Sequence, residues 1–526
     1  MADYLMPEDY GAVGDGVTDD AAAWASLLAA ADSSGKPILC KPTSIYALGS
    51  ASWAGLSLTL SRDLHIDLNG STLLVAALPT QNTVIGAGPA LFDFDGTSAK
   101  YRLSIQRGRI DLGGLLVYCF AAYRCDLNIF RCDFRNGDMS NSGIGVASVA
   151  VFTNACSGEI RENYSKNIGY MVFMGHTGAG YASDGLRVIA NRGEDFFNPS
   201  TPTHRGDFCV GVAKNAVIVG NVASGLFGGV AMAGYSGTPV ACENVQVIGN
   251  TFSDFTGNGI QTDIVTVPPN QVQARNIAIC GNTLRQGGAT SAGIYAIKMT
   301  NFSVTGNVID DCELGIVVDN VSNGVVSDNA IDGAGAATKY VGITVNDTLG
   351  TSSDIVVGPN HVINYDDVNS VGLNLPGTVT RVAISGGNYD DNTTGVRIIG
   401  GSKLTVSGVG AHGNGTDFNV QPLDCLLEAL SYDTQSGVQY YDLSGATPAI
   451  GRRRVYRLNN GGATAVTNFT GGADGQEILL YAANGNTTIN HSANIINVGA
   501  VNHTLAANRM ISYRRFSGTW FEEWRN

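Results

Sequence analysis

One short phrase recurs along most of this chain and limits the folds that it can adopt. Three or four alternating apolar residues are followed by Gly-Asn or a close variant, and successive copies end 22 to 32 residues apart. An inexact period of this length indicates stacked supersecondary units. The asparagines that close the clearest copies are Asn191, Asn221, Asn250, Asn282, Asn307, Asn329, Asn360 and Asn388.

Many repeats also hold a second short strand that opens with glycine, as in GIQTDIV (259–265), GIYAIKM (293–299) and GITVN (342–346). Two or three short strands per repeat, with few helices, are typical of a parallel β-helix. A leucine-rich repeat would need a leucine framework that this chain lacks, and propeller blades would be longer and carry aromatic signatures. The repeats therefore predict an all-β chain folded as a parallel β-helix.

The repeated asparagines have a structural explanation. Asn after Gly suits a bend in the left-handed backbone region, and stacked Asn side chains form ladders between neighbouring coils. We therefore expect a structural role, separate from any catalysis, for Asn221, Asn250, Asn282 and Asn307.

The start of the chain differs from the repeats. YGAVGDGVTDDAAAWASLLAAA (10–31) reads as a Gly-rich turn that leads into an amphipathic helix over 18–34, with Thr18 as a candidate N-cap. Trp24 and Leu28 lie on the apolar face of that helix. Because a stack of coils ends in open β edges that invite aggregation, a helix at this position predicts an N-terminal cap.

The composition argues against several classes of function. The chain has 526 residues, of which 68 are glycine and only 14% are charged. A formal net charge of −14 at pH 7 argues against a nucleic-acid partner. We expect no membrane span and no signal peptide, because long apolar stretches are absent and MADYLMPEDYG, the first residues, has no basic region. Ten cysteines occur singly and without zinc-ligand spacing, which predicts free, buried thiols in a protein that folds in a reducing cytoplasm.

The repeat stops near residue 420, and the rest of the chain has a different pattern. VYRLNN (455–460) and MISYRRFSGTWFEEW (510–524) alternate with period two. Trp520, Phe521 and Trp524 either contact partner chains or fill the core of a small β-sandwich. The domains that we expect are a cap (1–40), a β-helix (41–420), a linker (421–435) and a C-terminal β-rich oligomerisation module (436–526).

The segment over 10–31 resembles the N-terminal signature of the pectate-lyase-like superfamily of right-handed parallel β-helices. That superfamily includes pectin-degrading enzymes and the tailspike depolymerases of bacteriophages, and the coil repeats extend the resemblance to about residue 415. The C-terminal module resembles the β-rich pieces that hold three tailspike chains together. The free cysteines and the absence of a signal peptide favour a tailspike over a secreted pectinase.

The resemblance implies a homotrimer on the phage tail, attached to a tail or baseplate protein. Such a spike folds in the host cytoplasm and acts on the cell surface, where it binds and cleaves a bacterial polysaccharide (capsule, exopolysaccharide or O-antigen). No nucleic acid and no membrane would take part.

Two carboxyl groups are needed for glycoside hydrolysis, one as an acid and the other as a base or nucleophile. Alternate residues of each β-helix strand face outward, and one such row typically forms a sugar-binding groove. In GIQTDIV we expect Ile260 and Thr262 to point inward, so that Gln261 and Asp263 face the groove.

Asp263 is the main catalytic candidate, because its strand carries no other charge. Its partner would be Asp207 or Asp319, each two coils away. Two coils correspond to about 9.6 Å, at the upper edge of the range of about 6.5–9.5 Å for inverting enzymes. The side chains that we expect to contact the glycan are Gln261, Tyr295, Tyr235, His204, Arg205, His176 and Lys298.

Two other functions stay open. A polysaccharide lyase needs a base that removes the proton α to a uronate carboxyl and a cation that neutralises that carboxyl, and THRGD (203–207) offers His204 and Arg205. A non-catalytic spike would bind the glycan through aromatic and amide side chains alone.

The acidic groups within 183–197 and 309–315 could bind calcium, as pectate lyases of this fold do. No ordered calcium loop supports such a site, so we expect neither a metal nor another cofactor.

Overall fold

The computed structural model describes most of the chain, in two units. The N-terminal unit comprises Met1–Val317 and Gly333–Thr338, and the C-terminal unit comprises Val318–Asp332 and Lys339–Asn526. Residues 197, 198, 201–205, 428, 432 and 441 are described by their backbone. The described residues are 3–49, 53–80, 89–115, 117–138, 148–175, 182–198, 201–232, 241–262, 273–421, 425–428, 430–432, 441–452 and 454–525.

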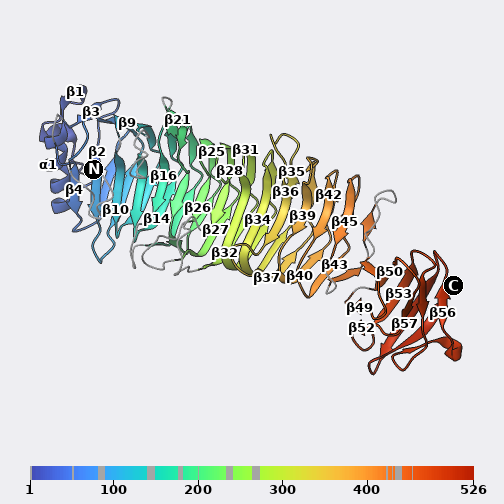
Figure 1. Cartoon of the computed structure of the whole chain (residues 1–526). Coiled ribbons are helices and arrows are strands. Elements are labelled where there is room, and N and C mark those ends of the chain that lie inside the picture. The colour runs from blue at the N-terminus through green and yellow to red at the C-terminus, as the bar shows by residue number, and fades with distance from the viewer. Residues whose placement is uncertain are drawn as a thin grey trace. The chain divides into compact units, whose positions relative to one another are not determined.

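The N-terminal unit is built from coils of three short strands, and each strand pairs in parallel with its equivalents in the coils before and after it (Figure 1). The strands thereby form three stacks. The first stack consists of β4 (Leu56–Thr59), β7 (Ala90–Asp95), β10 (Tyr118–Tyr123), β13 (Val149–Asn154), β16 (Tyr170–Met174), β22 (Cys209–Gly211), β26 (Val230–Met232), β29 (Ile260–Thr262) and the start of β32 (Ala292–Thr305).

The second and third stacks complete each coil. The second stack consists of β2 (Ile38–Leu39), β5 (Leu64–Asp67), β8 (Arg102–Gln106), β11 (Asp126–Phe130), β14 (Ser157–Arg161), β18 (Leu186–Ile189), β24 (Val217–Val219), β27 (Glu243–Ile248), β30 (Ala274–Cys280) and the end of β32. The third stack consists of β1 (Asp15–Asp19), β3 (Ile45–Leu48), β6 (Thr72–Val75), β9 (Arg109–Leu115), β12 (Asp133–Gly137), β15 (Tyr164–Lys166), β19 (Arg192–Glu194), β25 (Val222–Leu226), β28 (Thr251–Phe255), β31 (Thr283–Gly287) and β33 (Val308–Asp310).

The C-terminal unit repeats the three-strand coil. Its strands are β36 (Val341–Asn346), β39 (Val371–Leu375), β42 (Thr394–Ile398) and β45 (Thr416–Val420); β37 (Ser353–Val357), β40 (Thr380–Ser385), β43 (Leu404–Ser407) and β46 (Cys425–Glu428); and β35 (Ala330–Asp332), β38 (His361–Ile363), β41 (Asn388–Asp390), β44 (Gly410–Ala411) and β47 (Ser431–Tyr432). β34 (Leu314–Ser327) contributes residues to both units.

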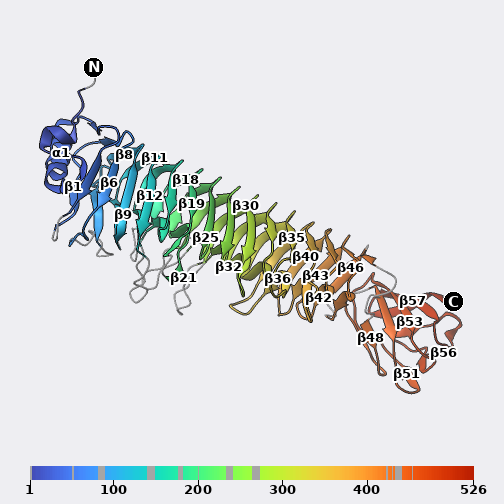
Figure 2. The ribbon, with the colours of Figure 1, turned by 90° about the horizontal axis from the view of Figure 1, so that it is seen from above.

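A helix covers the first coils of the N-terminal unit, as predicted (Figure 2). α1 spans Ala21–Ser34 and buries Trp24 against Tyr46 of β3 and Phe92 of β7, with ring centroids 5.6 and 6.3 Å apart. It begins three residues later than expected, because Asp20 uses its carboxylate to hold the preceding turn. Thr18 lies in β1 and is not the N-cap. The predicted fold class, a right-handed parallel β-helix with a capping helix and a C-terminal β-rich domain, is confirmed.

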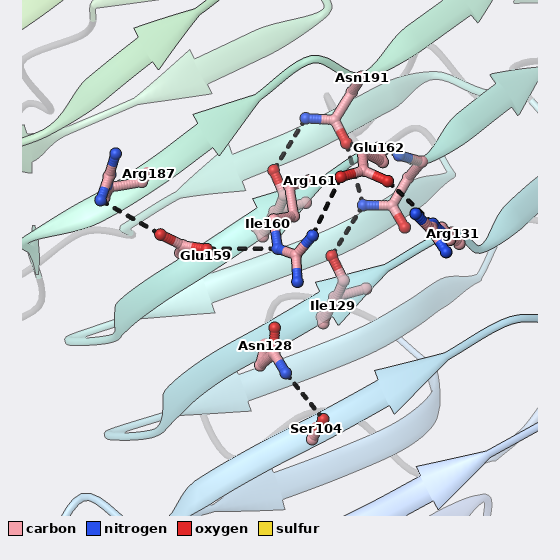
Figure 3. Close-up of polar contacts among 11 residues, drawn as sticks. Ser104, Asn128, Ile129, Arg131, Glu159, Ile160, Arg161, Glu162, Arg187 and Asn191 are labelled. Carbon is pink, nitrogen blue, oxygen red and sulfur yellow. Dashed lines mark hydrogen bonds and ion pairs between the residues drawn. The ribbon is translucent and has the colours of Figure 1, made fainter.

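A ladder of buried asparagines runs along the bend between the second and third stacks. The side-chain amide of Asn191 donates to the Ile160 carbonyl at 2.9 Å (Figure 3) and to Oδ1 of Asn221 at 3.0 Å. Equivalent bonds link each coil to the next. The ladder contains the four predicted asparagines and two others, and its members are Asn163, Asn191, Asn221, Asn250, Asn282 and Asn307.

We expect Asn250→Ala to lower the free energy of unfolding by about 1–3 kcal/mol and to leave the specific activity of the folded protein near normal. The substitution removes the acceptor of the main-chain N–H of Asn221 and the donor to the Ile218 carbonyl, both buried. Asn388 also closes a repeat but is exposed, so Asn388→Ala is the matched control and should change stability by less than about 0.5 kcal/mol. Urea unfolding measures the free energy of unfolding of both variants. Equal losses would contradict a stabilising role for the buried ladder.

A second, exposed asparagine ladder joins the coils at the bend between the first and second stacks. Side-chain amides link successive coils at 2.7 to 3.3 Å, and the first member donates to Asp184 at 2.8 Å. All four members have positive φ, which Asn tolerates better than most residues. They are Asn215, Asn244, Asn276 and Asn301.

The C-terminal module in the C-terminal unit has its own core. Its strands are β48 (Tyr441–Leu443), β50 (Val455–Leu458), β53 (Glu477–Ala482), β57 (Met510–Phe516), β58 (Thr519–Arg525) and β55 (Ile495–Ile496) in one sheet, with β51 (Thr464–Val466), β54 (Thr487–Ile489) and β56 (His503–Leu505) in another and β49 (Ala449–Ile450) paired with β52 (Thr470–Gly471).

The three C-terminal aromatic residues divide between core and surface. Trp520 is fully buried in the core of the module, and its indole N–H donates to the Phe469 carbonyl at 3.1 Å. Phe521 and Trp524 are 38% and 49% exposed. Trp520 is therefore a core residue, and only Phe521 and Trp524 stay candidates for contact with a partner chain.

The outward face of the second stack carries charges that pair with one another. Glu159 lies between Arg161 and Arg187 at 3.3 and 3.2 Å, and Glu162 lies between Arg131 and Arg161 at 2.9 and 3.0 Å (Figure 3). Exposed pairs of this kind contribute about 0–1 kcal/mol each. Their effect is to leave this face with compensated charge.

The ten cysteines are free, and all except Cys280 are buried. Among the described residues, no helix is both long and apolar enough to cross a bilayer.

Candidate functional site

The outward face of the first stack carries a row of side chains in register across seven coils. The row begins with alanine, is aromatic in the next two coils, aliphatic in its middle and polar or aromatic at its end. In chain order, its members are Ala121, Phe152, Phe173, Val210, Ala231, Gln261 and Tyr295.

Gln261 and Tyr295 are neighbours in this row, as the alignment of the repeats predicts. Ile260 and Thr262 are buried on either side of Gln261, whose side chain keeps part of its surface exposed. The amide of Asn258 donates to Gln261 Oε1 at 2.9 Å, and its own Oδ1 accepts the main-chain N–H of Ala292 at 2.9 Å. Asn258, which the repeat pattern did not single out, fixes the orientation of Gln261 toward the outward face.

Phe152 and Phe173 of the row belong to an aromatic cluster outside the β-helix core. Tyr118 stacks on Phe152 at 5.2 Å, Phe152 stacks on Phe173 at 5.3 Å, and Tyr170 meets Phe173 edge-on at 5.7 Å. Tyr118 and Phe152 are buried, while Tyr170 and Phe173 are partly buried. We call these four residues the aromatic cluster. Its sequence signal was an aromatic three residues into successive strands, as in VAVF and YMVF.

Asp207 lies next to this cluster. It is in the turn before β22, and because Val172 pairs with Cys209, the same register aligns Tyr170 with Asp207. On the following coil its neighbour is Gly228, where a Cβ atom would lie 2.7 Å from Asp207 Oδ1 and 2.6 Å from the Asn258 carbonyl. Only glycine leaves room for the carboxyl at this point.

The Asp207 side chain is 8% exposed. Burial raises the pKa of its carboxyl from the usual 3.8 to about 7, and a hydrogen bond from the main-chain N–H of Gly228 opposes this shift. A carboxyl group with such a pKa holds its proton in slightly acidic and neutral solution, as a general acid must.

Asp319, in the C-terminal unit, has a different environment. Its buried carboxylate accepts hydrogen bonds from the Thr348 hydroxyl and, at 3.1 Å, from the main-chain N–H of Leu349. These bonds hold the turn at 348–349. A catalytic part for Asp319 stays a prediction.

The other predicted site residues are described only in part. Lys298 is buried in β32 and has a left-handed backbone, with φ of 51°. His204 and Arg205 belong to β21 (Thr201–Arg205), which pairs with β20 (Phe197–Asn198), and their side chains lie outside the description. Asp263, Tyr235 and His176 also lie outside the described residues.

Metal ligands do not gather in the described part of the chain, where no group of three or more His, Cys, Asp or Glu side chains could hold an ion. On the described face, Asp207 offers a carboxyl with a raised pKa, and the row offers aromatic and amide side chains.

Comparison with known proteins gives one family match. Residues 440–521 match the model of the phage depolymerase C-terminal beta sandwich domain. The search of curated proteins found no match.

Several solved structures have similar folds at low sequence identity. A mutant tailspike protein of E. coli bacteriophage HK620 in complex with a pentasaccharide is 14% identical, with a TM-score of 0.49 over 83% of this chain and 77% of that one. The catalytic unit of a GH87 α-1,3-glucanase from Streptomyces thermodiastaticus is 14% identical, with a TM-score of 0.45 over 82% and 68%. PfbA, a surface adhesin of Streptococcus pneumoniae, is 12% identical, with a TM-score of 0.45 over 100% and 99%.

The chain thus has a parallel β-helix fold, and residues 440–521 are similar to the phage depolymerase C-terminal beta sandwich domain.

Proposed function

We propose that this protein is a phage tailspike depolymerase that cleaves glycosidic bonds of a bacterial surface polysaccharide by hydrolysis. The observation that carries the proposal is the Asp207 carboxyl on the first stack, buried in register with Tyr170 and Gly228 and with its pKa raised to about 7. The family match of residues 440–521 supports the phage origin.

In this mechanism Asp207 donates its proton to the glycosidic oxygen as the bond to the leaving sugar breaks. A second carboxylate activates the attacking water, and we assign this part to Asp263, which follows β29 directly. The register of β22, β26 and β29 aligns Asp207 with Gly228 and Asn258, so Asp263 lies two coils away and five residues farther along the strand direction, not directly in line with Asp207 as the repeats predict.

The test is the chemistry of the products formed from the polysaccharide of a strain on which the protein clears a bacterial lawn. Hydrolysis releases reducing ends without ultraviolet absorbance, whereas β-elimination leaves an unsaturated uronate that absorbs. Unsaturated products, together with activity that Asp263→Asn spares and His204→Ala or Arg205→Ala abolishes, would replace hydrolysis by the lyase mechanism. Binding without any cleavage would make the protein a non-catalytic spike.

We also propose that the native form is a homotrimer at the phage tail, held by the module after residue 436. An intertwined or packed β-module adds an obligate interface that coils alone lack, and the exposed Phe521 and Trp524 offer apolar surface for it. Deletion of 436–526 should therefore convert a trimer to a monomer in sedimentation experiments. A trimer that survives the deletion would place the interface on the coils.

A further inference from the structure

Asn154, the last residue of β13, has an unusual environment. Its side chain is fully buried, yet neither the amide nitrogen nor the amide oxygen has a hydrogen-bond partner among the described residues. A buried amide without partners costs about 1–3 kcal/mol. Native proteins seldom keep such a group unless a water molecule or a ligand completes its bonds.

The position of Asn154 links it to the aromatic cluster. Asn154 follows Phe152 by two residues in the same strand, so both side chains point to the outward face. In the coil before, its register partner is Tyr123. In the next coil, Thr153 pairs with Met174, so the residue beside Asn154 is Gly175, which has no side chain. The amide therefore lies at one edge of the aromatic cluster, and its neighbour in the next coil has no side chain.

We propose that the aromatic cluster and the Asn154 amide form a binding subsite for an uncharged sugar residue, one that carries hydroxyl or acetamido groups. The amide offers two donors and an acceptor, which match a hydroxyl or an acetamido group. The partly buried rings of Tyr170 and Phe173 offer apolar surface to the C–H groups of the sugar. The four residues of the cluster are uncharged, which favours a neutral sugar over a uronate at this point.

This inference rests on the proposed function. It adds the side of the cleavage site on which the neutral sugar binds. Tyr170 belongs to the cluster and is also the register neighbour of Asp207. The subsite therefore occupies the coils on the N-terminal side of the proposed acid. A polysaccharide cleaved at Asp207 would place a neutral sugar on the N-terminal side of the bond that breaks.

The experiment measures binding of the full chain carrying Asp207→Asn, which we expect not to cleave, to an array of purified capsular and O-antigen polysaccharides. Asn154→Leu and Phe173→Leu are then added singly. We expect each to weaken binding to the recognised polysaccharide at least tenfold. The melting temperature of Asn154→Leu should stay equal or rise, because the substitution removes an unpaired buried amide.

Asn128→Leu is the matched control, since Asn128 donates to Ser104 at 3.0 Å on the second stack (Figure 3) and should not affect glycan binding. Unchanged affinity in both Asn154→Leu and Phe173→Leu overturns the subsite but leaves the proposed function intact. If Asn154→Leu lowers the melting temperature and leaves affinity unchanged, the amide is structural and the subsite is again overturned. An array on which no polysaccharide is bound overturns the proposed function and the subsite together.

Discussion

Asp207→Asn should abolish cleavage of the polysaccharide and at the same time make the folded protein more stable above pH 7. Loss of a general acid lowers turnover by a factor of about 10² or more. The amide is nearly isosteric with the carboxyl, so the fold and the contacts with Gly228 are kept. A gain in stability together with a loss of activity is the signature of a residue retained for chemistry.

The sign of the stability effect follows from the two states of the carboxyl. In the unfolded chain Asp207 has its usual pKa of 3.8, and in the folded protein its pKa is about 7. Between these values the folded state holds a proton that the unfolded state has released, so stability falls as pH rises from about 4 to about 7. Above pH 7 the loss stays constant, with an upper limit of about 4 kcal/mol.

Asparagine has no proton to lose and removes this dependence. Unfolding of wild type and Asp207→Asn should thus coincide near pH 4 and diverge toward pH 8, with the variant the more stable. Activity of the wild type should fall as pH rises through about 7, because the acid loses its proton. A variant that is less stable than wild type at pH 8, or that retains turnover, would assign Asp207 a structural role.

Comparison of Asp263→Asn with Asp319→Asn identifies the second carboxylate. We expect Asp263→Asn to lower turnover by about 10² or more and Asp319→Asn to lower mainly stability. The difference arises because the Asp319 carboxylate already holds the turn at 348–349. Loss of turnover only in Asp319→Asn would transfer the assignment to that residue.

Trp520→Ala should destabilise the C-terminal module by about 3–5 kcal/mol. The indole is fully buried, contacts the ring of Phe469 edge-on at 6.1 Å and donates a hydrogen bond to the Phe469 carbonyl. Truncation therefore leaves both a cavity and an unpaired carbonyl. Thermal unfolding of the full chain, followed by tryptophan fluorescence and calorimetry, measures the loss.

Trp524→Ala is the matched control. Its side chain is 49% exposed, so truncation should change the stability of the module by less than about 0.5 kcal/mol. If Trp524 contacts a partner chain, the same variant should weaken the trimer in sedimentation experiments. Equal destabilisation by the two variants would contradict the division of the aromatic residues between core and surface.

The sequence by itself predicted the coils, the cap and the buried asparagines. Period, alternation and the Gly-Asn bend act within one coil, and each coil meets an almost identical copy of itself, so local patterns determine the stacking. The same regularity predicted that Gln261 and Tyr295 would be neighbours. Asn163 was not predicted as a ladder member, because glutamate precedes it where most other repeats carry glycine or another small turn residue. Its side chain nevertheless makes the same bonds.

Only the tertiary structure decided how deeply each outward side chain is covered and what it meets. The local sequences around Asp207, Asn154 and Trp520 resemble those of other repeats or strands. Nothing in them distinguishes a buried carboxyl or amide from a solvated one. Trp520 is buried and Trp524 is half exposed, although both belong to β58. Burial depends on residues some 20 to 50 positions away, as with Asp207 and Gly228 or Trp520 and Phe469. Desolvation by such distant neighbours is what raises the pKa of Asp207, the property on which its proposed role as the acid rests.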